Sequence, residues 1–189
     1  MKMQSMKKNL SVLGFAALSV MGYCAFAEES NSAKAAASGP TDPQIAAIVV
    51  AANQVDIDAG KMAKTSHNKE VRSFANQMIT DHTAVNKQAV ALVTKLHVQP
   101  EENDTSKALK DGGAENLANL KKLKGAEFDK AYVSHEVAYH QQVLDAVDKV
   151  LIPNAKNAEL KALLEKVRPS FEAHLKHAET MQAAMNKST

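Results

Sequence analysis

The chain has 189 residues, of which 45% are hydrophobic and only 4% are aromatic, with 23 basic residues against 21 acidic ones. A chain of this size and hydrophobicity can bury a core without help from disulfides, and its single cysteine excludes an internal disulfide. Abundant Ala, Leu and Lys together with few aromatic residues favour helices over sheets.

The first segment has the three parts of an export signal. Three lysines precede residue 9, an apolar stretch covers residues 10–21, and Ala-Phe-Ala at 25–27 matches the small-x-small pattern of a cleavage site. The apolar stretch is short for a membrane span. We therefore predict a signal peptide at 1–27, a mature chain that starts at Glu28, and a location in the periplasm or cell envelope. The alternative is an uncleaved anchor.

Cleavage changes the charge balance. The signal contains three lysines and no acidic residue, so its removal leaves 20 basic residues against 21 acidic ones and a net charge of −1. Cys24 is removed with the signal, which leaves no thiol. The mature chain therefore has no excess of positive charge to suggest a nucleic-acid partner, and after cleavage we expect no transmembrane helix.

A polar, small-residue segment at 28–41 predicts a flexible linker, and the helical pattern that follows predicts one domain at 42–186. The domain is expected to open with Asp42 as the N-cap residue and Pro43 in the first helical position.

Apolar residues recur at helical spacing through four long segments, and their ends coincide with turn residues. They predict long helices at 43–64, 68–97, 126–152 and 157–186, with Pro153 ending the third. Between the second and third, Gly112 and Gly113 favour an irregular segment followed by one short helix near 114–124. The predicted fold is an all-α, ferritin-like four-helix bundle with a long crossover connection that carries a short extra helix.

Each long helix has ionisable residues within its apolar stripe. On helical wheels these are Asp56, His82, Glu136, His140 and His174. His135 lies at the edge of the third stripe. Because an unpaired charge is costly in a core, these groups are expected to satisfy one another, to bind water or to bind a metal.

Three histidines and two carboxylates that converge in a helical core form a candidate metal site, with His135 in a supporting position. Such donors suit Fe, Zn, Mn or Cu. The usual di-iron signature, Glu-x-x-His on each of two helices, does not occur in this sequence. The alternatives to a metal site are a hydrogen-bonded polar layer without a ligand, which fixes the register of the helices, and proton-transfer chemistry.

Four stretches resemble a known family. They are VDIDAGKMA at 55–63, VRSFANQMITDHTAVN at 71–86, GAEFDKAYVSHEVAYHQQVL at 125–144 and RPSFEAHLKHA at 168–178. In these stretches the chain resembles the domain of unknown function 4142 family, whose members are exported bacterial proteins. The resemblance implies a ferritin-like helical fold over about 42–186. Asp56 and Asp58 stand where the family usually has glutamate, and Tyr139 replaces a common acidic residue.

The leading functional interpretation is an exported accessory or stress protein of the envelope with a buried cluster of histidines and carboxylates. One alternative is a transition-metal-binding or oxidoreductase module, and another is a protein-interaction module. The sequence has no phosphate-binding glycine loop, no Gly-x-Ser-x-Gly and no zinc-protease motif. We therefore assign no catalytic residue. The expected partner is an envelope protein or a second copy of the chain.

Overall fold

The computed structural model describes residues 39–187, and every regular secondary-structure element within that range is a helix. The predicted signal peptide and most of the predicted linker lie outside the described residues. The helices are α1 (Asp42–Ala63), α2 (Lys69–Lys95), α3 (Asp104–Leu120), α4 (Gly125–Ala146), the π-helix η2 (Val147–Leu151), α5 (Ile152–Asn154) and α6 (Ala158–Lys187). No helix of this part of the chain combines the length and the apolar character needed to cross a membrane.

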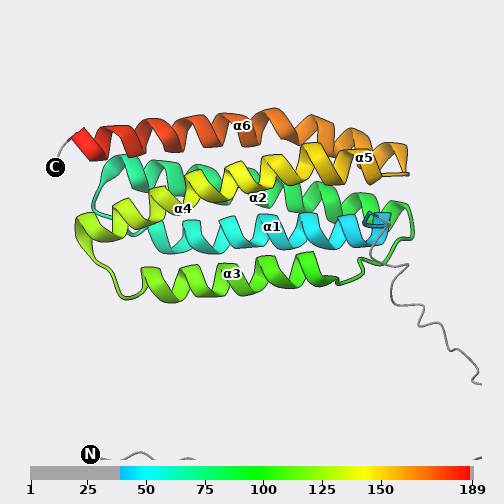
Figure 1. Cartoon of the computed structure of the whole chain (residues 1–189), viewed down its shortest axis with the longest axis horizontal. Coiled ribbons are helices and arrows are strands. Elements are labelled where there is room, and N and C mark those ends of the chain that lie inside the picture. Colours follow the sequence, from blue (N-terminus) through cyan, green and yellow to red (C-terminus); the bar gives the residue numbers. More distant parts are fainter. Residues whose placement is uncertain (1–38, 188–189) are drawn as a thin grey trace, which may run out of the picture.

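The long helices lie side by side along the longest axis of the domain (Figure 1). α1 packs mainly against α2 and α3, and α4 packs mainly against α6. Smaller contacts join α2 to α6 and α1 to α4. Because α1, α2, α4 and α6 contact one another in a closed ring, one side of each faces a shared interior, while α3 covers an outer side of α1.

The N-terminus of α1 differs by one residue from the prediction. Thr41 is the N-cap, and the Gln44 side chain accepts a hydrogen bond from the Thr41 backbone N–H at 3.1 Å. Asp42, predicted as the cap, is the first helical residue. Its carboxylate instead accepts hydrogen bonds from the backbone N–H groups of Lys156 at 2.8 Å and Asn157 at 2.9 Å. A side chain at the start of α1 therefore holds the entry to α6 in place.

The predicted short helix at 114–124 is wrong in its extent, because α3 spans Asp104–Leu120. Asn103 caps it by accepting a hydrogen bond from the Ser106 N–H at 3.1 Å, and the helix continues through both glycines. Gly113 allows a close approach to α1: a Cβ at that position would lie 2.7 Å from Cγ2 of Val55, whereas a Cβ at Gly112 would meet nothing within 4 Å. The glycine at 113 serves helix packing and not a helix break.

The third predicted helix, 126–152, corresponds to α4 followed by η2 and α5. Pro153 does not end the helix before it, since α5 includes this residue and the chain becomes extended only at Ala155. The π-helix widens the backbone at Val147–Leu151. Such segments are rare and frequently occur at functional sites.

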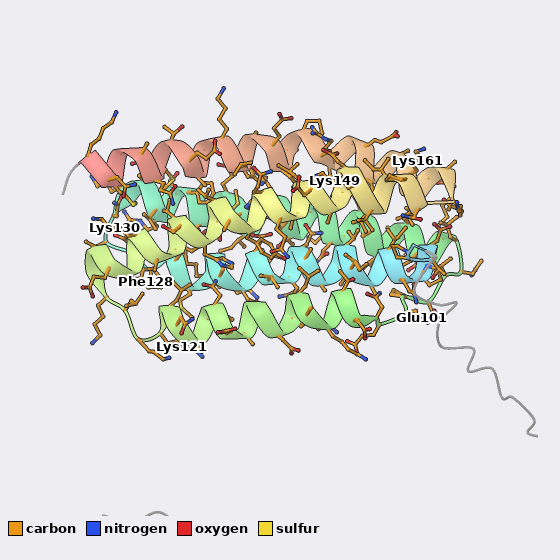
Figure 2. All side chains as sticks on the ribbon, in the orientation of Figure 1. Glu101, Lys121, Phe128, Lys130, Lys149 and Lys161 are labelled. Atoms are coloured by element: carbon orange, nitrogen blue, oxygen red, sulfur yellow. The ribbon has the colours of Figure 1, made fainter. Side chains whose placement is uncertain are left out.

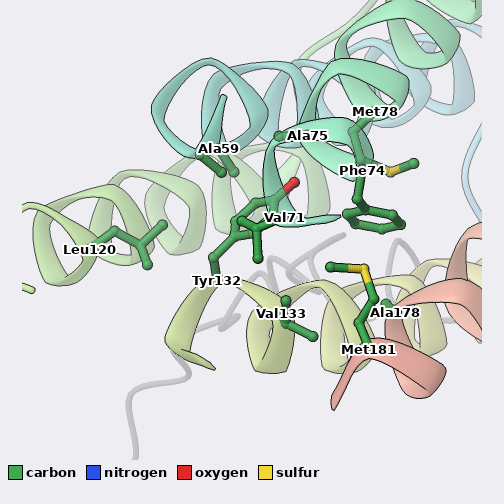
Figure 3. Packing of buried hydrophobic residues seen from close by; sticks show 11 residues of the cluster. Ala59, Val71, Phe74, Ala75, Met78, Leu120, Tyr132, Val133, Ala178 and Met181 are labelled. Carbon is green, nitrogen blue, oxygen red and sulfur yellow. The ribbon is translucent and has the colours of Figure 1, made fainter. Parts of the chain in front are cut away.

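Apolar side chains fill the interior on both sides of its polar centre. Figure 3 shows Phe74 and Met78 of α2 facing Met181 of α6, with Tyr132 of α4 beside them; all four are fully buried. Charged side chains cover the outside, where Lys121, Lys149 and Lys161 extend from the ribbon (Figure 2). This division places the few ionisable groups of the interior in a site of low polarity.

Candidate metal centre

All four long helices contribute to a cluster of ionisable side chains in the interior. Asp56 comes from α1, His82 from α2, Glu136 and His140 from α4, and His174 from α6. None of them is more than 2% exposed. Helical periodicity brings them inward, because each lies among the apolar residues of its helix.

Two overlapping groups within the cluster have ligand atoms close enough to hold one ion. One ring nitrogen from each of His82, His140 and His174 lies within 4.8 Å of the other two, and one ligand atom from each of Asp56, Glu136 and His140 does the same. The three imidazole ring centres form a nearly equilateral triangle with sides of 5.5, 5.3 and 5.4 Å. His140 belongs to both groups and joins the carboxylates to the other histidines.

The proton of His82 is positioned by Asn53. The Asn53 amide nitrogen donates to the Val49 carbonyl at 2.7 Å, so the amide oxygen faces His82, where it lies 2.8 Å from Nδ1. That oxygen can only accept a hydrogen bond, and therefore Nδ1 carries the proton. The other nitrogen, Nε2, has a free lone pair and has no hydrogen-bond partner.

His140 and His174 are oriented in the same way. Nδ1 of His140 lies 3.0 Å from the Glu136 carbonyl oxygen, and Nε2 of His174 lies 2.9 Å from a carboxylate oxygen of Asp81. Both partners only accept, so the free lone pairs are on Nε2 of His140 and Nδ1 of His174. Neither of these two nitrogens has a hydrogen-bond partner. Three bare lone pairs therefore occur together in one buried cluster.

Burial keeps these histidines neutral. It is the largest cause that lowers the pKa of His82 well below its usual range, followed by the neighbouring His140 and His174. Burial also lowers the pKa of His140 to about 4. Burial lowers the pKa of His174 too, but its hydrogen bond to Asp81 offsets part of that change. Neutral imidazole is the form that binds metals.

The two carboxyl groups show the opposite shift. Burial raises the pKa of Glu136 to about 8, although the neighbouring Asp56 carboxyl and Tyr132 hydroxyl reduce that increase. Burial and then Glu136 raise the pKa of Asp56 well above its usual range. Both Glu136 carboxylate oxygens, one Asp56 oxygen and the Tyr132 hydroxyl make no hydrogen bond. A nearby cation would favour ionisation of both carboxyl groups.

The structure brings together all five residues that the sequence singled out, and it places His135 beside them. His135 stacks on Tyr139, with ring centres 5.4 Å apart, and Tyr139 packs edge-on against His140. Sequence reasoning missed the role of Asn53, which orients His82. The signal was available, since Asn53 is a polar residue three positions before Asp56 on the same helical stripe.

The family assignment agrees with this geometry. A family model described as Domain of unknown function (DUF4142) matches residues 27–181. The chain belongs to this family. No curated protein and no solved structure matches the chain. The DUF4142 match covers every residue of the cluster but names no activity, so the function has to be argued from the cluster itself.

Proposed function

We propose that this chain binds one transition-metal ion in the core of an exported, ferritin-like helical bundle in the periplasm or cell envelope. The proposed ligands are His82, His140 and His174, and Asp56 and Glu136, which form a second group of close ligand atoms with His140, supply negative charge beside the ion. The observation that carries the proposal is the set of three buried imidazole lone pairs, each without a hydrogen-bond partner and each oriented by an acceptor on the opposite ring nitrogen.

The distances between the three imidazole rings are consistent with their binding the same metal ion. Three imidazoles bound tetrahedrally at about 2.0 Å would place their ring centres about 5.2 Å apart. The three ring centres lie 5.3 to 5.5 Å apart. Metal-bound histidines usually donate a hydrogen bond from the other ring nitrogen to an acceptor, as these three do.

The carboxyl groups supply charge that a metal ion needs. Two anions balance a divalent cation, and no Lys or Arg is among the buried residues of the described chain. Imidazole suits Zn, Fe and Cu, while added carboxylates extend the choice to Mn. We therefore expect a divalent first-row ion that is bound mainly through nitrogen and is balanced by the two carboxylates.

A hydrogen-bonded polar layer explains the cluster less well. In such a layer the buried groups should satisfy one another, because each unsatisfied group costs about 1–3 kcal/mol. Here His82, Glu136, His140 and His174 all keep unpaired atoms. A protein-interaction surface also has little support, since the exposed large hydrophobic residues of the described chain are only Val90 and Val150, on different helices.

The arrangement of the helices supports the ferritin-like part of the proposal. α1 pairs with α2, α4 pairs with α6, and the long connection between the pairs contains α3. A crossover between two helical pairs is the topology of ferritin-like bundles, which also build their metal sites from inward-facing residues of all four helices. The export signal predicted at 1–27 supports the envelope location.

The test is a melting series of the purified, metal-free protein with Zn, Mn, Fe(II) or Cu, together with elemental analysis of protein from its own host. A metal that binds only the native state adds about 2.7 kcal/mol of stability at a hundredfold excess over its Kd. We expect an increase in Tm with at least one metal at one ion per chain. The double variant His82→Leu/His174→Leu should lose this increase.

The control is His67→Ala, which removes an exposed imidazole outside the cluster. This variant should keep the full increase in Tm. If no metal raises the Tm of the wild type, the metal proposal is wrong and the cluster is structural. If the increase persists in the double variant, the ion binds elsewhere and the proposed ligands are wrong.

A further inference from the structure

A cavity of about 310 Å³ lies next to the candidate centre, between α1, α3, α4, η2 and α6. Its walls are largely aliphatic, with Ile48, Val49, Leu109, Val143 and Leu164 among them. No Asp, Glu, Lys or Arg lines it. A charged molecule would therefore lose its hydration without gaining a partner of opposite charge, which excludes ions as occupants.

The buried polar groups of the cavity wall leave one hydrogen-bonding position open. The Asn53 amide is occupied by His82 and Val49, and the Tyr139 hydroxyl donates to the Ala52 carbonyl at 3.1 Å. His135 differs, because its Nε2 is buried and has no hydrogen-bond partner. An occupant could thus satisfy one buried imidazole nitrogen while the rest of it contacts apolar side chains.

We propose that this cavity binds a small, uncharged, mainly apolar molecule that carries one hydrogen-bonding group, and that His135 contacts this group. The volume is suited to a single substituted ring, since an apolar cavity of about 150 Å³ is sufficient for benzene. Pockets that combine apolar walls with few polar groups are typical of small-molecule sites.

The cavity shares part of its wall with the metal cluster. Phe171 stacks on His82 with ring centres 5.3 Å apart, Tyr139 packs edge-on against His140, and Asn53 contacts His82. All three also line the cavity. η2 contributes Val147 and Leu151 to the opposite part of the wall. A molecule in the cavity is therefore separated from the proposed metal by a single layer of side chains. The coupling between cavity and metal rests on the proposed metal function, whereas binding of a molecule in the cavity does not.

Phenol and toluene are suitable probes, because they differ by one hydrogen-bonding group. Calorimetric titration of the metal-free full chain with phenol should show one saturable site, with a Kd on the order of 1 mM or lower. Ala146→Leu places a larger side chain in the cavity wall and should weaken phenol binding at least tenfold. Ala138→Leu makes the same change at an exposed position of the same helix and should leave the Kd unchanged. Circular dichroism melting establishes that both variants fold.

A separate variant tests whether His135 contacts the hydrogen-bonding group of the bound molecule. His135→Phe keeps an aromatic ring beside Tyr139, so it should weaken phenol binding about tenfold and leave toluene binding unchanged. Absence of saturable phenol binding to the wild type, or equal binding by Ala146→Leu and Ala138→Leu, would overturn the proposal. Equal losses of phenol and toluene binding in His135→Phe would overturn the assignment of His135.

The last arm separates this inference from the metal proposal. In protein loaded with Co(II), phenol should change the visible absorption of the ion. If Co(II) binds but its spectrum does not respond to bound phenol, the link between cavity and centre is wrong. If Co(II) does not bind, the metal proposal fails, while the titrations of metal-free protein still decide whether the cavity takes its ligand.

Discussion

Replacement of Glu136 by glutamine should remove a large part of the alkaline instability of the metal-free protein. Glu136 has a pKa raised to about 8 by burial, and that of its neighbour Asp56 is raised well above the usual range. At pH values between the ordinary pKa of each carboxyl group and its raised pKa in the native protein, the native state holds a proton that the unfolded state has released. The free energy of unfolding therefore falls as pH rises, by about 1.4 kcal/mol per pH unit for each carboxyl group.

The histidines change stability in the opposite direction and at lower pH. Burial lowers the pKa of His140 to about 4, so this residue makes the protein more stable as pH rises from about 4 to 6.5. Above about pH 7.5, one unit above the ordinary pKa of histidine, this contribution is nearly complete. In the window from about pH 7.5 to 8.5 the carboxyl groups therefore dominate. There the wild type should lose stability as pH rises, with a contribution from Glu136 of up to about 1.4 kcal/mol per pH unit, and Glu136→Gln should lose stability less steeply.

The assay is urea unfolding of metal-free protein at several pH values in this window. Glu127→Gln serves as the control, because it neutralises an exposed carboxyl group in the first turn of the same helix. It should retain the slope of the wild type. Equal slopes for the wild type and Glu136→Gln would show that Glu136 is not held protonated in the native state, and the electrostatic reasoning about the pair would be refuted.

Gly113→Ala should destabilise the protein by about 1–3 kcal/mol through the contact with α1, whereas Gly112→Ala should stabilise it by about 0.5–1 kcal/mol; urea unfolding that ranks them equally would contradict the packing role. Asp81→Asn should weaken metal binding 10- to 100-fold, because the orientation of His174 is lost; unchanged affinity in a metal titration would remove Asp81 from the site. Intact mass of the exported protein should correspond to a chain that starts at Glu28, and a full-length mass would show that the signal is retained.

The four long helices and the ionisable residues of the central cluster were predictable from the sequence. Both depend on a local property, the 3.6-residue period, which places Asp56, His82 and His174 on the apolar side of their helices without knowledge of any neighbour. The extent of α3 was not predictable in this way. Two consecutive glycines in a sequence indicate a break. Only the position of Val55 on α1 shows that the glycine at 113 makes room for the packing of two helices.

The hydrogen bonds that orient the side chains of the cluster were decided only by the tertiary structure. The sequence does not state which ring nitrogen of His82 or His174 is free, because that depends on acceptors from other helices. These acceptors are Asn53 of α1 for His82 and Asp81 of α2 for His174. The cavity is likewise a property of the spacing between α1, α3 and α4. Periodicity shows which side of a helix is buried, but the distance and direction between side chains on different helices are set only when the helices pack.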